Sequence, residues 1–126
     1  MDKARWKEAC LVAERVFSSD VVIKDDKDIY GAPMKVDFVY MDPGRRTPCV
    51  VIHARWQQVG GSVDQKFPFF MLNAKKCRYP VIFVLGGDGF KAGARKWLES
   101  EARRAKNVLH VFSEEQFQEW ANNGNL

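Results

Sequence analysis

Apolar positions follow several spacings along the chain, and each spacing predicts a different kind of element. Recurrence at three and four residues predicts amphipathic helices at 2–17 and about 90–105. Short apolar runs predict five strands. In chain order they are 21–23, 34–41, the strand that contains His53, 81–85 and 108–112. The uninterrupted run at 81–85 is typical of a strand that is buried on both faces.

Turn and cap signals divide these elements. Asp42-Pro43-Gly44 predicts a hairpin turn between the second and third strands, and the polar segment 25–33 predicts a turn before them. Ser18 and Ser19 are expected to end the first helix. Ser62 to Gln65 has the form of a capping box and predicts a helix that runs to about Lys76, in which Pro68 either kinks the helix or marks its true start. A second capping box, at 113–116, opens a last helix through Trp120.

The predicted order is therefore α-β-β-β-α-β-α-β-α. Three consecutive strands favour an antiparallel meander, whereas the strand-helix-strand units that follow favour parallel pairing with right-handed crossovers. We expect one α/β domain over 1–126, with a mixed central sheet flanked by helices.

The third strand carries a polar pair on an otherwise apolar background. Strand alternation places His53 and Arg55 on one face and Ile52 and Ala54 on the other. Gln57 would share the polar face if the strand continued that far. Asp37, within the second strand, is the acid most suited to meet this pair. These residues are the candidates for chemistry.

Charge and cysteine content narrow the class of protein. The net charge of +4 is compatible with a polyanionic partner, and basic residues are concentrated at 75–78 and 91–106. Both groups also fit solvated helix ends, and the two interpretations stay open. Three cysteines without C-x-x-C spacing predict neither a disulfide framework nor a zinc site. With no apolar run of membrane-spanning length and no secretory pattern, we expect an intracellular protein, cytoplasmic or nucleoid-associated, and no membrane partner.

The element order, with an acid on the second strand and a polar pair on the third, resembles the PD-(D/E)XK nuclease superfamily. Its restriction-endonuclease-like core is α-β-β-β-α-β, which implies that the last α-β-α elements of this chain are a C-terminal extension. Val36-Asp37-Phe38 matches the family's aspartate strand. On the third strand, His53 stands where the family has an acid, and Arg55 where it has a lysine.

The resemblance implies a divalent cofactor, Mg²⁺ or Mn²⁺, if the protein is active, and otherwise none. Mg²⁺ prefers oxygen ligands, whereas His53 offers nitrogen, so the substitution is expected to weaken the usual metal or change it. Arg55 keeps a positive charge near a phosphate but cannot act as a base.

Three functions remain open. In the first, the chain is a metal-dependent endonuclease in which Asp37 binds the metal with Glu14 or Asp64, while His53, Arg55 and Gln57 take part in catalysis. In the second, the site is degenerate and the fold serves as a DNA-binding or assembly module. In the third, it is a protein-interaction subunit without nucleic acid. DNA contacts would come from Arg55, Lys66, Lys75, Lys76, Lys91 and Arg95, and the resemblance allows a homodimer or larger assembly.

Overall fold

A computed structural model describes residues 16–41, 48–57, 63–87 and 89–125. Within these ranges the strands are β1 (Val16–Lys27), β2 (Pro33–Met41), β3 (Pro48–Trp56), β4 (Val81–Gly86) and β5 (Val108–Ser113). The helices are α2 (Phe67–Lys76), α3 (Ala92–Arg104) and α4 (Glu114–Trp120), with the short helical segments η1 (Asp64–Lys66) and η2 (Ala121–Asn125).

The described strands form one mixed sheet in the order β1-β2-β3-β4-β5. The first three strands pair antiparallel, and β3, β4 and β5 pair parallel. The predicted meander, the parallel crossover units and the α-β-α extension are therefore confirmed. The predicted first helix lies outside the described residues up to position 15.

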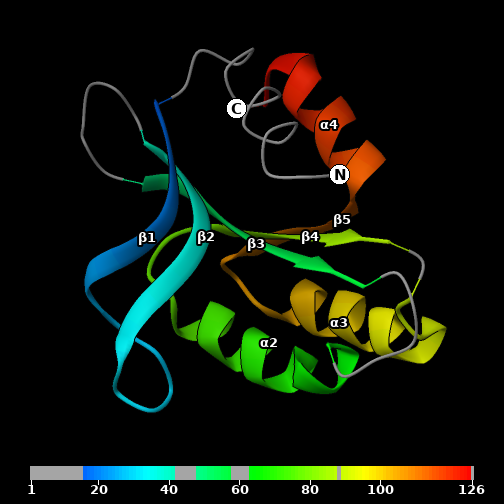
Figure 1. Ribbon diagram of the computed structural model, residues 1–126, viewed down its shortest axis with the longest axis horizontal. Coiled ribbons are helices and arrows are strands. Elements are labelled where there is room, and N and C mark those ends of the chain that lie inside the picture. Colours follow the sequence, from blue (N-terminus) through cyan, green and yellow to red (C-terminus); the bar gives the residue numbers. More distant parts are fainter. Residues whose placement is uncertain (1–15, 42–47, 58–62, 88, 126) are drawn as a thin grey trace.

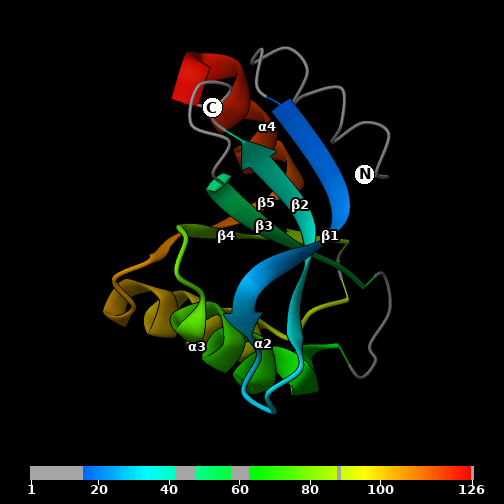
Figure 2. The same cartoon turned by 90° about the vertical axis from the view of Figure 1, so that its left-hand side faces the viewer.

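Helices cover the sheet on both sides (Figures 1 and 2). Helices α2 and α3 lie on one face, and α4 lies on the other. Strand β4 contributes to both cores, because Phe83 and Leu85 pack toward α2 and α3 while Ile82 and Val84 pack toward Phe117 of α4. All six residues of β4 are buried. This confirms that the apolar run at 81–85 is a strand buried on both faces.

The beginning of the described chain corrects the helix prediction. Val16 and Phe17 belong to β1, where they pair with Met41 and Tyr40 of β2. Their spacing suits a helix as well as a strand, and the pairing of this segment with β2 across the sheet decides between the two. Ser18 and Ser19 therefore lie inside a strand and do not end a helix.

The turn between β1 and β2 is shorter than predicted. Strand β1 continues to Lys27, with an irregularity in its pairing after Ile23, and only 28–32 form the turn. Oδ1 of Asp28 accepts hydrogen bonds from the backbone N–H groups of Tyr30 and Ala32. Gly31 has φ of 83°, a backbone conformation that glycine adopts without steric cost. The β1–β2 hairpin thus ends in a loop that is closed by its own hydrogen bonds.

Helix starts follow the cap signals in part. Ser62 of the first predicted capping box lies outside the described residues, and α2 begins at Phe67 with Pro68 in its first turn. Pro68 therefore marks the true start of that helix, since proline is tolerated where no intrahelical N–H partner exists. The second capping box is confirmed, because Gln116 N–H donates to Oγ of Ser113 and Ser113 N–H donates to Oε1 of Gln116.

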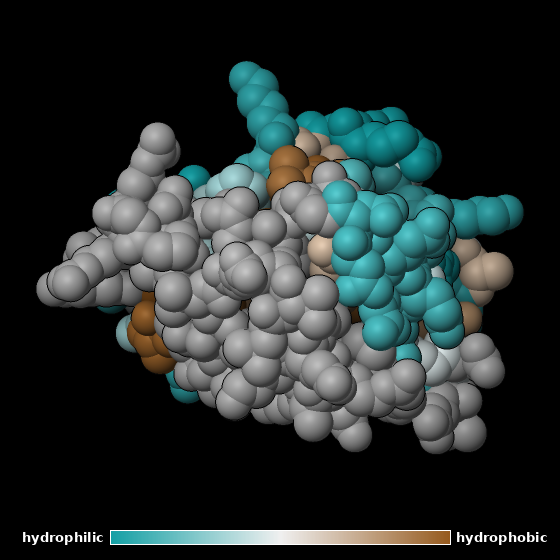
Figure 3. All heavy atoms as spheres, turned by 90° about the horizontal axis from the view of Figure 1, so that it is seen from above, coloured by the Kyte–Doolittle hydropathy of each residue, from teal (hydrophilic) through white to brown (hydrophobic). Residues whose placement is uncertain are grey.

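The outer side of α4 is hydrophilic, as the view from above shows (Figure 3). Its exposed side chains are Glu115, Gln116 and Glu119. None of the described helices combines the length and the apolar character needed for a bilayer crossing.

Candidate functional site

The two faces of β3 differ in chemistry, as strand alternation predicts. Val50 and Ile52 belong to the core beneath α4, whereas Val51 belongs to the core beneath α2 and α3. His53 and Arg55 lie on the same side as Val51, where they contact Phe83 and Phe70. The predicted polar pair therefore faces helix α2.

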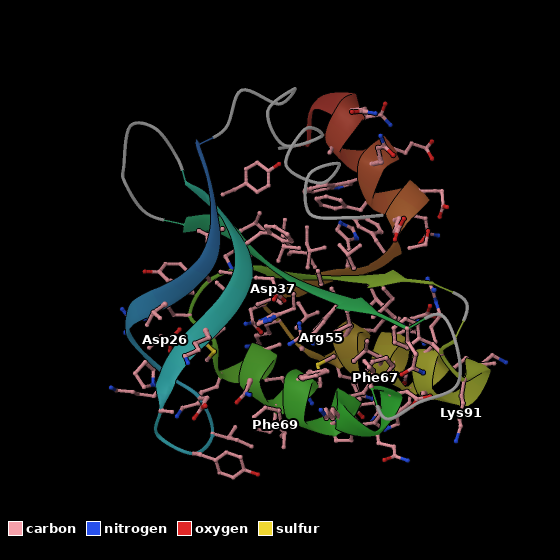
Figure 4. The ribbon with its side chains drawn as sticks, in the orientation of Figure 1. Asp26, Asp37, Arg55, Phe67, Phe69 and Lys91 are labelled. Carbon is pink, nitrogen blue, oxygen red and sulfur yellow. The ribbon has the colours of Figure 1, made fainter. Side chains whose placement is uncertain are left out.

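Asp37 joins this pair from the neighbouring strand. Phe38 pairs with Ile52, so the antiparallel register brings Asp37 opposite His53. Oδ2 of Asp37 accepts a hydrogen bond of 2.6 Å from Nη1 of Arg55 and one of 2.9 Å from the backbone N–H of Ala54. Figure 4 shows Asp37 and Arg55 beside each other above α2. The structure thus brings the three central candidates together.

The guanidinium of Arg55 is held from three directions. Besides the ion pair with Asp37, Nη1 donates to the carbonyl of Ala54 at 2.7 Å, and Cζ lies 4.1 Å from the centre of the Phe70 ring. The Arg55 and Asp37 side chains are only 25% and 30% exposed. Their charges therefore compensate each other in a partly dehydrated setting, where such a pair is screened less than on the surface.

His53 is a buried and neutral imidazole. Its side chain stacks on Phe83 with ring centres 5.5 Å apart, and the residue is only 5% exposed. Burial, and to a smaller extent the positive charge of Arg55, lower the pKa of His53 to about 4, although the negative charge of Asp37 acts in the opposite direction. Its Nε2 has no hydrogen-bond partner among the described residues, which is costly for a buried polar atom.

A cavity of about 300 Å³ lies over this polar face. Residues of three elements line it, and we call them its floor (His53 and Arg55 of β3), its wall (α2) and its mouth (the β1–β2 hairpin). The lining residues are Asp28, Ala32, Pro33, Met34, Lys35, His53, Arg55, Phe69, Phe70 and Asn73. The α2 wall was not predicted from the sequence, although the aromatic cluster Phe67-Pro68-Phe69-Phe70, the next apolar run after the polar strand, is a signal that could have suggested it.

Contacts hold the hairpin against α2. Oδ1 of Asn73 accepts a hydrogen bond from the backbone N–H of Ile29, and Nζ of Lys76 donates to the carbonyl of Asp28. The ring of Tyr30 stacks on Phe69 at 5.5 Å. The mouth of the cavity is therefore fixed by three separate interactions between the loop and the helix.

Gln57 lies away from the cavity and performs a structural task. Strand β3 ends at Trp56, so alternation no longer places the next side chain. Nε2 of Gln57 donates to the carbonyl of Gly89 at 2.7 Å, and Oε1 accepts from the N–H of Val63 at 2.9 Å. The side-chain amide thus joins the loop after β4 to the segment before α2.

Replacing Gln57 with Ala is expected to lower the free energy of unfolding by about 2 kcal/mol, because it leaves the partly buried carbonyl of Gly89 and the N–H of Val63 without their partner. Urea denaturation measures this effect. The matched control is Gln65→Ala, at an exposed position of η1, with an expected change below about 0.5 kcal/mol. Equal stability of the Gln57 variant and the wild type would contradict the structural role.

The other proposed metal ligands do not complete a site with Asp37. Glu14 lies outside the described residues. Oδ2 of Asp64 accepts a hydrogen bond of 3.2 Å from the N–H of Lys91, and Figure 4 places Lys91 well apart from Asp37. No three His, Cys, Asp or Glu side chains of the described ranges are grouped closely enough to hold a metal ion.

The donor set at the centre therefore does not fit Mg²⁺. This ion needs several oxygen ligands in near-octahedral geometry. Among the described residues, the carboxylate beside the polar pair is that of Asp37, which is engaged by a guanidinium 2.6 Å away, and the position opposite it is an imidazole. An ion at Asp37 would have to displace Arg55 and would gain no second carboxylate from β3.

Some of the basic side chains predicted to contact DNA are already paired within the protein, and others are not. Lys75 pairs with Glu101, Arg95 with Glu99, and Arg55 with Asp37. Lys76 donates to the carbonyl of Asp28. Lys66 and Lys91 are exposed, and within the described part of the chain no partner for either ammonium group is found. These two lie where the chain leaves the carboxyl ends of β3 and β4.

Together, a mixed sheet with a three-strand meander, an acid on β2 and a polar pair on β3 define a restriction-endonuclease-like domain. The family model of the PD-(D/E)XK nuclease superfamily domain matches residues 1–125, and the chain belongs to this superfamily. No curated protein and no solved structure shows a significant match to it.

Proposed function

We propose that the chain is a DNA-binding domain of the nuclease fold that does not cleave DNA by the superfamily's metal-dependent chemistry. The ion pair between Arg55 and Asp37 carries this proposal, because it engages the carboxylate that would otherwise bind the metal. Membership of the superfamily and the net charge of +4 support a nucleic-acid partner.

Phosphate contacts are assigned first to Lys66 and Lys91. Both side chains are exposed, and the hydrogen bond from Lys91 N–H to Asp64 brings η1 and the start of α3 together. In open α/β sheets ligands bind beyond the carboxyl ends of the strands, which is where these two segments begin. Lysines there would bind the backbone of a duplex without reading its sequence.

Two measurements test the proposal. In a plasmid-nicking assay with Mg²⁺ or Mn²⁺, the wild type and Asp37→Ala are expected to show the same background. A labelled DNA duplex is expected to bind with log affinity falling against log salt with a slope of about −2 or steeper. Lys66→Ala with Lys91→Ala should reduce the steepness by about 2 and weaken binding at low salt by about tenfold.

Lys75→Ala is the matched control, since that lysine is already paired with Glu101, and its effect should stay below about twofold. Nicking by the wild type that Asp37→Ala abolishes would show an active nuclease and overturn the catalytic half of the proposal. Absence of binding at low salt would overturn the DNA-binding half and favour a protein-interaction subunit.

A further inference from the structure

The cavity above β3 offers an uncharged interior. Arg55 is compensated by Asp37, and the lining holds one further acid, Asp28, and one further base, Lys35, so that these four charges sum to zero. His53 is neutral at physiological pH, since its pKa is lowered to about 4. A phosphate or another anion would have to break the ion pair to gain Arg55, so charge complementarity favours a neutral occupant.

The interior is also polar at one point and aromatic at another. His53 lines the cavity, and its buried Nε2 lacks a partner among the described residues. Such an atom is satisfied when an occupant supplies a donor or acceptor. Phe69 and Phe70 line the wall. Aromatic side chains stack on any flat heterocyclic ring, whichever base it is.

The volume of the cavity and its opening to solvent limit which neutral molecules could occupy it. About 300 Å³ lies at the lower end of the range of small-molecule sites, which suits one ring system with its attached sugar. Ala32, Pro33 and Lys35 at the mouth are exposed, so the cavity opens to solvent between the hairpin and α2. Lys35 stands there as a cation next to any backbone that enters with the ring.

From these observations we infer that the cavity binds a single unpaired nucleobase of a DNA strand, with the ring against Phe69 and Phe70 and its hydrogen-bonding edge on His53. This inference rests on the proposed DNA-binding function. It adds the structural feature of DNA that the domain would recognise, an unpaired base. Taking a base out of the stack is least costly where it has no pairing partner. The domain would therefore prefer DNA with an unpaired base.

The test compares two duplexes that differ at one position. Each carries 2-aminopurine at the centre, opposite thymine in one and opposite an abasic site in the other. The wild type is expected to bind the second duplex about tenfold more tightly at equal salt. The fluorescence of 2-aminopurine should rise on binding as the base leaves its stacked neighbours.

Cavity variants should lose the preference and keep the affinity for the paired duplex. His53→Phe removes the free ring nitrogen and retains an aromatic ring beside Phe83, and Phe69→Ala removes part of the wall. The matched control is Leu72→Ala, an exposed residue of α2 that does not line the cavity, which should keep both affinities. Circular dichroism confirms that each variant is folded.

Equal affinity for the two duplexes, with salt-dependent binding intact, would overturn the base pocket and leave the proposed function standing. Binding of neither duplex would overturn both. Adenosine has the ring and the sugar without phosphate, so its binding distinguishes a pocket for free nucleosides from a pocket for a base of a DNA strand. Binding of adenosine in the absence of any preference between the duplexes would show a pocket for free nucleosides and overturn the assignment to a DNA strand.

Discussion

A double variant, His53→Glu with Arg55→Lys, is expected to bind Mn²⁺ at least about tenfold more tightly than the wild-type chain. The change places a carboxylate opposite Asp37 on the neighbouring strand, because Phe38 pairs with Ile52 and the next residues face each other. Two carboxylates on adjacent strands supply the oxygen ligands that the present donor set lacks. Titration calorimetry measures the affinity directly.

The second substitution matters as much as the first. The planar guanidinium of Arg55 bonds both Asp37 and the carbonyl of Ala54, whereas a lysine ammonium is a compact charge on a flexible stem that can move aside. His53→Glu alone should therefore gain less, because Arg55 would pair with either carboxylate. Adding Asp37→Ala to the double variant should remove the gain.

The thermal midpoint gives an independent readout of the same event. A metal that binds the folded chain raises Tm as its concentration exceeds the dissociation constant. Mn²⁺ should thus raise Tm of the double variant and leave that of the wild type unchanged. If calorimetry and Tm detect no difference between the two proteins, the positions of Asp37 and residue 53 do not converge on one ion, and the loss of the metal site has another cause.

Periodicity predicted the elements of the sheet well where one pattern dominated. The run at 81–85 had length, composition and flanking turns that suit only a buried strand, and β4 confirms it. Val16 and Phe17 fitted two patterns at once. Their assignment depends on Met41 and Tyr40, which are more than twenty residues away, so local spacing could not decide it.

The positions of the three central residues were predictable from the sequence, but the ion pair between Asp37 and Arg55 was not. Strand alternation placed His53 and Arg55 on one face, and the register confirms that Asp37 faces them. That the carboxylate is engaged by the guanidinium depends on side-chain torsions which spacing does not encode. Gln57 was placed on the same face only by extending a strand that ends one residue earlier.

The cavity was not predictable because it forms between distant segments. Its mouth comes from the β1–β2 hairpin and its wall from α2, and these meet through contacts such as Ile29 N–H with Asn73. His53 lines this cavity, and its Nε2 is buried. A sequence shows a histidine in an apolar strand, but only the assembled structure shows that one of its nitrogens lacks a partner among the described residues.

Acidification is expected to destabilise the fold through His53. Its pKa is about 4 in the folded chain and near 6.5 in the unfolded chain. As the pH falls from about 6.5 to about 4, the unfolded state takes up a proton that the folded state does not bind, so the free energy of unfolding decreases across this window. The difference between the two pKa values corresponds to a loss of about 3 kcal/mol, and stability is full above pH 6.5.

Urea denaturation over this window, for the wild type and His53→Gln, isolates the contribution. Arg55 and Asp37 are the charged groups that act on the ring, and Asp28 and Lys35 line the same cavity; all four are unchanged in the variant. The glutamine does not titrate, so its curve should be flatter by about 3 kcal/mol between the two ends. His110→Gln is a second comparison on β5, away from the cavity: burial lowers the pKa of His110 as well, so this variant should also flatten the curve, but less than His53→Gln because His110 is only partly buried. Parallel curves for the wild type and His53→Gln would mean that the imidazole is not kept neutral by its burial, and the uncharged character assigned to the cavity would fail with it.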